Sequence, residues 1–230
     1  MKSVVSQAGA ILDFYKGLNP SFKLPKGVSL MNPYANRGSW SLTKSFYQKY
    51  YSDSIPRTFI FGINPGRFGG GVTGIPFTDP IRLEEECGIT NELKKLPELS
   101  SQFIYGMIDK FGGPDRFFGH FFFSALSPLG FVQAGKNLNY YDNRELYQES
   151  EPFIIDCIKK QLKTISASKT CICLGEGQNF NYFEKLNEKN GFFAEIIPLP
   201  HPRWIMQYRR KRIDEFVEQY VRTLGKVIGQ

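Results

Sequence analysis

Histidine and cysteine are scarce in this chain, and long apolar runs are absent. The 230 residues include two histidines and four cysteines. None of the cysteines has the C-x-x-C spacing of zinc or iron–sulfur ligands, so we expect no metal and no cofactor. No run reaches the roughly 20 apolar residues that span a bilayer, and the N-terminal stretch does not resemble a signal peptide. We therefore expect a soluble, intracellular protein with no membrane partner.

Acidic residues are outnumbered by basic ones. The chain has 22 Asp and Glu against 29 Lys and Arg, which gives a net charge of +7. A basic surplus favours polyanionic partners, chiefly nucleic acid, although charge alone is equally consistent with solubility. The position of the charge says more, because basic residues crowd one short stretch near the C-terminus. They are Arg203, Arg209, Arg210, Lys211 and Arg212.

Four short apolar runs predict the strands of a buried parallel sheet. Each run is continuously apolar rather than alternating, as in strands that helices cover on both faces. The runs are Thr58–Ile63, His120–Ala125, Thr170–Leu174 and Ala194–Pro198. Helical segments separate them, which is typical of α/β proteins. We therefore predict one domain over residues 1–230, a three-layer α/β/α sandwich with a central, mainly four-stranded parallel sheet.

The expected helix boundaries come from capping residues and apolar spacing. Ser3 is the expected N-cap of a first helix that ends at Tyr15. Asp142, with Glu145 three residues later, resembles a capping box. We expect the last helix over roughly 208–224. In sheets of this kind ligands bind beyond the carboxyl ends of the strands.

The most informative segment follows the first predicted strand. It reads GINPGRFGGGVTGIPF from Gly62 to Phe77. Its glycines allow a ligand to approach the backbone. No Lys-Ser/Thr pair follows them, which excludes a phosphate-binding P-loop. The pair Asn64-Pro65 breaks the turn that a dinucleotide-binding fingerprint requires.

This segment resembles the first motif of the single-strand-selective monofunctional uracil-DNA glycosylases. The residues that match in register are Gly62, Asn64, Pro65, Gly66, Phe68, Gly69, Thr73, Gly74, Pro76 and Phe77. Weaker matches lie at Asn32-Pro33, Trp40, Ser127-Pro128-Leu129 and Gly135-Lys136-Asn137, and at a second catalytic motif, His201-Pro202-Arg203. The resemblance implies the fold of the uracil-DNA glycosylase superfamily. It also implies an enzyme that flips a base out of DNA and hydrolyses its N-glycosidic bond.

The resemblance assigns roles to particular residues. Asn64 would position the attacking water, which an amide can do because the sugar cation already reacts readily. His201, as a neutral imidazole, would donate a hydrogen bond to the oxygen of the departing base, with the Ile63 backbone N–H as second donor. Phe77 would stack on the base, a contact worth about 1–3 kcal/mol. Gly66 and Phe68 are also expected at the base site.

The stretch after His201 combines apolar residues with arginines. This suits a wedge that enters the base stack while cations hold phosphates. An ordinary amphipathic helix with a solvated basic face is the alternative. The expected DNA-binding residues are Arg203, Trp204, Ile205, Met206, Tyr208, Arg209, Arg210 and Arg212.

Two departures from the family pattern affect specificity. The family reads the base edge with an asparagine at the position of Ala125, and Ser127 stands where the family has cysteine. Ser124 is the nearest polar replacement, and we expect looser discrimination that includes hypoxanthine and xanthine. In the second catalytic motif Arg203 follows Pro202 directly, so the wedge loop has a different shape.

We therefore predict a monofunctional DNA glycosylase that excises uracil from single- or double-stranded DNA and leaves an abasic site. It should act as a monomer in the cytoplasm, associated with the nucleoid. Two alternatives remain open. One is a non-catalytic single-stranded nucleic-acid-binding protein on the same fold, which would tolerate Asn64→Ala. The other is a small-molecule nucleoside hydrolase, which would bind DNA with little salt dependence.

Overall fold

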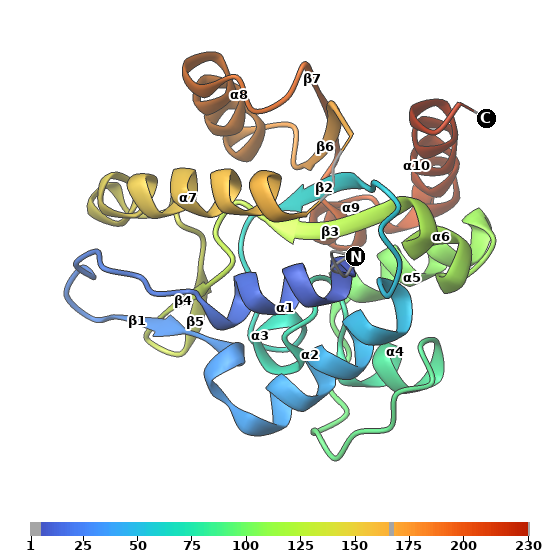
Figure 1. Cartoon of the computed structure of the whole chain (residues 1–230), viewed down its shortest axis with the longest axis horizontal. Coiled ribbons are helices and arrows are strands. Elements are labelled where there is room, and N and C mark those ends of the chain that lie inside the picture. The colour runs from blue at the N-terminus through green and yellow to red at the C-terminus, as the bar shows by residue number, and fades with distance from the viewer. Residues whose placement is uncertain (1–5, 166–167, 230) are drawn as a thin grey trace, which may run out of the picture.

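A four-stranded parallel sheet is the centre of the molecule (Figure 1). The structure is a computed structural model and describes residues 6–165 and 168–229. The strands lie in the order β3-β2-β6-β7. Their bounds are β2 Thr58–Gly62, β3 Phe121–Ala125, β6 Thr170–Leu174 and β7 Glu195–Leu199. The predicted fold class is confirmed, and the predicted β6 has the observed bounds.

The two central strands are buried along nearly their whole length, which explains their continuous apolar character. In β2, Phe59 and Phe61 are fully buried, and Phe61 packs against Phe183 of the helix α8. On the opposite face of the sheet, Phe123 of β3 packs against Phe117 of α6. The strands β2 and β3 pair in register from Thr58 opposite Phe121 to Gly62 opposite Ala125, so their carboxyl ends lie level.

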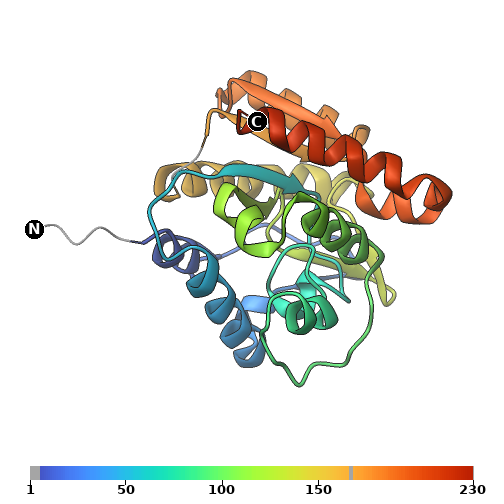
Figure 2. The same ribbon diagram turned by 90° about the vertical axis from the view of Figure 1, so that its right-hand side faces the viewer.

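Helices cover both faces of the sheet. In Figure 1, α7 and α8 lie on one side of the sheet, and α5, α6 and α10 lie on the other. Figure 2 shows α1 and α2 at the side of the molecule away from α8 and α10. The helices are α1 Gln7–Lys16, α2 Arg37–Tyr50, α3 Gly70–Thr73, α4 Pro80–Glu85, α5 Leu99–Phe111, α6 Pro114–His120, α7 Arg144–Thr164, α8 Gln178–Asn190, α9 Pro202–Tyr208 and α10 Ile213–Val227, with short 3-10 helices at η1 Pro33–Ala35 and η2 Arg210–Arg212.

A second, three-stranded antiparallel sheet was not predicted. It has the order β1-β4-β5, with bounds β1 Val28–Met31, β4 Gly130–Gln133 and β5 Lys136–Leu138. A two-residue turn joins β4 to β5, and both of its residues, Ala134 and Gly135, have positive φ. That conformation is typical of a tight hairpin. The hairpin carries the chain from β3 back to the glycine-rich segment after β2.

Three expected helix boundaries differ from the structure. The first helix begins at Gln7 with Ser6 as its N-cap, and Ser3 lies outside the described residues. Asn143, not Asp142, caps α7, because its side chain accepts from the Leu146 N–H. The predicted last helix is interrupted at Arg209, where α9 has ended and η2 begins.

None of the helices in the described ranges is both long and apolar enough to cross a membrane. All four cysteines are buried, and none of them forms a disulfide bond.

Candidate active site

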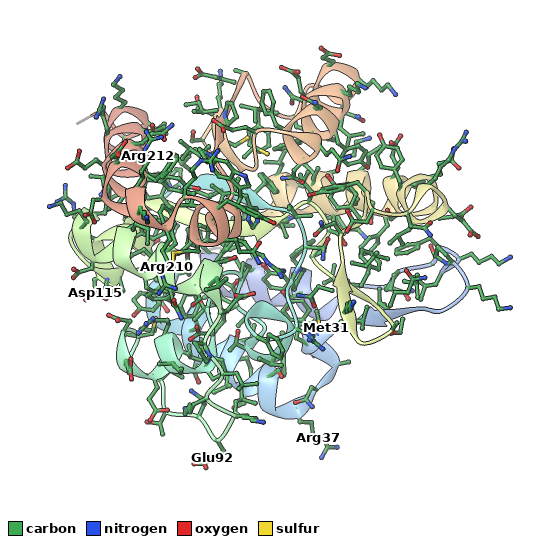
Figure 3. All side chains as sticks on the ribbon, turned by 180° about the vertical axis from the view of Figure 1, so that it is seen from behind. Met31, Arg37, Glu92, Asp115, Arg210 and Arg212 are labelled. Atoms are coloured by element: carbon green, nitrogen blue, oxygen red, sulfur yellow. The ribbon has the colours of Figure 1, made fainter. Side chains whose placement is uncertain are left out.

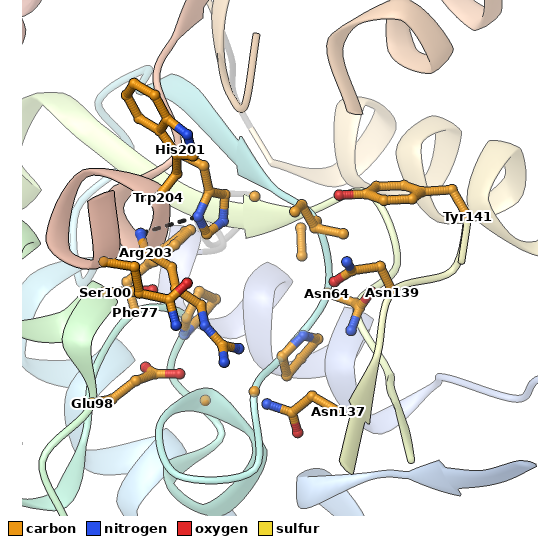
Figure 4. A pocket seen from close by; sticks show the side chains of 18 of the residues that line it. Asn64, Phe77, Glu98, Ser100, Asn137, Asn139, Tyr141, His201, Arg203 and Trp204 are labelled. Atoms are coloured by element: carbon orange, nitrogen blue, oxygen red, sulfur yellow. Dashed lines mark hydrogen bonds between the residues drawn. The ribbon is translucent and has the colours of Figure 1, made fainter. Parts of the chain in front are cut away.

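A cavity of about 340 Å³ opens at the carboxyl ends of β2, β3 and β7. The volume lies within the usual range of ligand pockets. Figure 4 shows its walls: His201, Phe77, Arg203, Ser100 and Glu98 lie on one side, and Asn64, Asn139 and Tyr141 on the other. The lining residues are Gly62, Ile63, Asn64, Pro65, Gly66, Gly70, Pro76, Phe77, Glu98, Ser100, Ala125, Asn137, Asn139, Tyr141, His201, Arg203, Trp204, Gln207 and Tyr208.

Backbone groups of the segment after β5 hold the Asn64 side chain. Its Nδ2 donates to the Leu138 carbonyl oxygen at 3.2 Å, and its Oδ1 accepts from the Tyr140 N–H at 3.2 Å. These two bonds fix which end of the amide is oxygen. A carbonyl oxygen has two lone pairs, so Oδ1 can accept one further hydrogen bond from a water molecule in the cavity.

The His201 ring is held in one tautomer. Its Nδ1 accepts from the Arg203 N–H at 3.2 Å, which makes His201 the N-cap of α9. Burial and, to a smaller extent, the nearby Arg203 charge lower the pKa of the imidazole to about 4. The ring is therefore neutral at physiological pH, as expected from the sequence. Since Nδ1 is the acceptor, the proton is on Nε2, which is a hydrogen-bond donor.

The two side chains approach the cavity from strands that are not adjacent. Asn64 follows β2 and His201 follows β7, with β6 between them. Two strand spacings amount to roughly 10 Å. The structure therefore brings Asn64 and His201 to one cavity from strands that are two positions apart in the sheet.

Phe77 occupies a strained position beside Gly62. Its φ of 56° is in the left-handed region, which non-glycine residues rarely adopt. The ring packs against Phe123, with centroids 5.2 Å apart, and lies 6.1 Å from the His201 ring. A Cβ on Gly62 would lie 2.6 Å from Phe77 Cζ, so the ring needs a glycine there. Strained residues of this kind are concentrated at binding sites.

Six polar residues of the cavity wall were not among the predicted site residues: Glu98, Ser100, Asn137, Asn139, Tyr141 and Gln207. Burial and the negative charge of Asp79 raise the pKa of the Glu98 carboxyl to about 7, against the opposing effect of Arg203. Glu98 and Ser100 lie at the start of α5, and the two asparagines belong to β5 and the segment after it. Asn137 belongs to a segment with a weak family match, but no sequence pattern marks the others, because long-range folding brings them to the cavity.

Ser124 does not reach the cavity, which corrects the expectation that it reads the base. It is fully buried, and its hydroxyl donates to Gln161 Oε1 of α7 at 2.6 Å. Neighbouring residues of a strand point to opposite faces. Because Ala125 lines the cavity, Ser124 must face the other side of the sheet. No side-chain amide therefore stands at the family's base-reading position.

Of the three candidate wedge residues Trp204, Ile205 and Met206, only Trp204 is exposed. Ile205 is fully buried and Met206 is 7% exposed, so neither can enter a base stack. Trp204 and Tyr208 are exposed and line the cavity. The Arg209 guanidinium lies over the Trp204 ring, 4.8 Å from its centroid.

The remaining expected residues lie in three places: the cavity wall, an adjoining groove and the exposed surface. Gly66, Ile63 and Arg203 line it. Phe68 lies in an adjoining groove. Arg210 and Arg212 are exposed at the end of the molecule formed by α9 and α10 (Figure 3).

Metal-binding groups do not gather in the part of the chain that the structure describes. No three His, Cys, Asp or Glu residues there could hold one ion.

The fold agrees with what comparison with known proteins shows. The model of the uracil DNA glycosylase superfamily matches residues 48–225. The chain therefore belongs to the uracil-DNA glycosylase superfamily, a class of DNA repair glycosylases. A crystal structure of wild-type SMUG2 from Pedobacter heparinus is similar, with 40% sequence identity and a TM-score of 0.95 over 99% of this chain and 100% of that one. No curated protein sequence matches the chain significantly.

Proposed function

We propose that this protein is a monofunctional glycosylase that hydrolyses the bond between deoxyribose and uracil in DNA, and that it also accepts other deaminated bases. The observation that carries the proposal is the presence of Asn64 and a neutral His201 on opposite walls of one cavity. We further propose that the chain acts as one domain and as a monomer on cellular DNA.

In the proposed reaction the C–N bond breaks first and the base leaves with the electron pair. His201 Nε2–H and the Ile63 N–H donate to the oxygen of the departing base, where negative charge develops. Such preorganised donors commonly contribute about 3–4 kcal/mol each. A neutral donor suits this task because it needs no buried cation.

Asn64 acts on the sugar side. Its Oδ1 accepts a hydrogen bond from water and turns the water oxygen towards the cationic anomeric carbon. Both amide groups are already fixed by Leu138 and Tyr140, so little conformational freedom is lost in the transition state. The water oxygen forms the new C–O bond, and its proton passes to solvent or to the base anion.

A broad range of bases is proposed because of Ala125. An amide presents one fixed donor and acceptor pair, whereas a methyl group imposes none. We expect Ala125→Asn to narrow the range towards uracil.

The absence of a lyase step is proposed from the cavity lining. Strand cleavage by a glycosylase of this kind needs an amine to form a Schiff base. Lysine is not among the described residues that line the cavity.

The test is an excision assay on oligonucleotides that carry uracil, hypoxanthine or xanthine, with Asn64→Ala as a parallel sample. We expect the wild type to release each free base and leave an intact strand with an abasic site, and Asn64→Ala to bind DNA without releasing a base. A chain that binds single-stranded DNA but releases nothing would support the non-catalytic alternative. Activity confined to free nucleosides would support the nucleoside hydrolase.

A further inference from the structure

A second groove adjoins the base cavity. Its volume is about 440 Å³, and it shares Glu98, Ser100, Asn137 and Arg203 with the cavity. These four residues form the boundary between the two spaces. A DNA strand with one nucleotide in the cavity can therefore place a neighbouring nucleotide in this groove.

One wall of the groove presents an exposed aromatic ring. Phe68 is 39% exposed, so part of its ring is accessible to a ligand in the groove. The Arg67 guanidinium lies over the ring, 4.5 Å from its centroid, and donates to the Gly135 carbonyl oxygen. The Arg67 backbone N–H donates to Asn137 Oδ1 at 3.1 Å. The hairpin between β4 and β5 thus holds the Arg67–Phe68 pair in place.

The rest of the groove suits a phosphate. Arg67, Lys136 and Arg203 line it together with a single carboxyl group, Glu98. Burial and Asp79 raise the pKa of that carboxyl to about 7, so it carries little negative charge in mildly acidic solution. Ser100 is 5% exposed, lines both spaces, and its hydroxyl has no hydrogen-bond partner among the described residues. A hydroxyl that has no protein partner can donate a hydrogen bond to a ligand in either space.

We propose that this groove is a subsite for the nucleotide next to the extruded one, with that neighbour's base stacked on Phe68 and its phosphate bound by Lys136, Arg203 and the Ser100 hydroxyl. The inference rests on the proposed function, since it assumes a DNA strand with one base in the cavity. It gives the protein contact with a single strand independently of base pairing, because aromatic stacking tolerates every base.

The experiment combines protein variants with altered DNA. Single-stranded oligonucleotides carry one deoxyuridine, and either its 5′ or its 3′ neighbour is replaced by a tetrahydrofuran spacer, which keeps the phosphate but lacks a base. Binding is measured in proteins that also carry Asn64→Ala, so that the DNA stays intact. Excision is measured in proteins that retain Asn64. The test variant is Phe68→Leu, and its control is Ile55→Ala, an exposed apolar residue just before the amino end of β2.

We expect the spacer on one side to weaken binding roughly 5- to 100-fold, the range of base–aromatic stacking. Phe68→Leu should weaken binding of normal DNA by a similar factor and should lose nothing further with that spacer. Lys136→Gln should weaken binding of every oligonucleotide more than Lys189→Gln, which removes the same charge from the far end of α8.

The proposal is overturned if Phe68→Leu behaves like Ile55→Ala, or if its loss is the same with and without each neighbouring base. Failure of the proposed function gives a different result, because the wild type would then release no base while the binding measurements would still report on the subsite.

Discussion

Asn64 and His201 are both oriented by backbone groups rather than by other side chains. Backbone positions are fixed by the surrounding strands and helices, so both groups are preorganised before any DNA binds. Both residues are also uncharged when they act. The amide cannot titrate, and the imidazole stays neutral.

The neutral state of His201 predicts a simple pH dependence. Because the folded pKa is about 4 rather than 6.5, the excision rate should show no loss from histidine protonation between about pH 8 and pH 5.5. The free energy of unfolding also depends on this pKa. Below about pH 6.5 the histidine of the unfolded chain binds a proton that the folded protein does not bind. The contribution of His201 to stability is therefore complete above about pH 6.5 and decreases as the pH falls towards 4. Single-turnover excision rates of the wild type and of His201→Asn, measured across this pH range, test the prediction for the rate. A loss centred near pH 6.5 in the wild type alone would contradict it.

Gly62 predicts a second effect at the residue scale. A Cβ there would lie 2.6 Å from the Phe77 ring, whereas one on Gly106 of α5 would meet nothing within 4 Å. Gly62→Ala should therefore displace the ring and reduce excision at least tenfold, which corresponds to about 1.4 kcal/mol. Gly106→Ala should leave excision unchanged and stabilise the helix by up to about 1 kcal/mol. Equal excision rates for the two variants would contradict the stated role of Gly62.

The sequence could predict some of the site but not all of it. Asn64, His201 and Phe77 were predicted because their motifs resemble those of the family, and all three line the cavity. The rejection of Ser124 was also available from the sequence, since strand alternation excludes Ser124 once Ala125 faces the cavity. The place of Glu98 in the site could not be predicted, because Glu98 lies far along the chain from the glycine-rich segment and only the fold brings the two together.

At the scale of elements, continuous apolar runs identified the parallel strands to within about one residue. The antiparallel hairpin was missed because β4 and β5 have only four and three residues, and β5 is exposed or half-buried. The break between α9 and α10 was missed because the arginines there are compatible with a continuing helix.

Arg57 gives a prediction at this scale, because it joins β2 to α6. It is 1% exposed, and its Nε donates to the Phe118 carbonyl oxygen at 2.8 Å. Its other end pairs with Asp53 at 2.8 Å. Arg57→Leu leaves that carbonyl unsatisfied and should lower the unfolding free energy by about 3 kcal/mol.

The matched control for Arg57 is Arg82, whose ion pair with Glu85 is on the surface. Arg82→Leu should change stability by less than about 1 kcal/mol. Urea unfolding of both variants provides the comparison. Similar losses in the two would show that Arg57 is not a structural link.

For the whole molecule, the distribution of charge predicts how DNA binding depends on salt. Arg203 lines both the cavity and the groove, whereas Arg212 already pairs with Glu215 at 2.7 Å. Each phosphate contact with a single strand contributes roughly 0.7 to the slope of log affinity against log salt. Arg203→Gln should reduce the slope by about that amount, and Arg212→Gln should change it little. Fluorescence anisotropy titrations in increasing salt measure the slopes. A larger reduction for Arg212→Gln would contradict the assignment.

The claim that two residues act on opposite sides of one base can be measured with a better leaving group. 5-Fluorouracil leaves more easily than uracil, because its anion is more stable. The measurement is single-turnover excision of the two bases by the wild type, Asn64→Ala and His201→Ala. His201→Ala should be impaired much less on 5-fluorouracil than on uracil, whereas Asn64→Ala should be impaired equally on both. If His201→Ala shows the same deficit on both bases, or if Asn64→Ala excises uracil as fast as the wild type, the two residues do not have these roles.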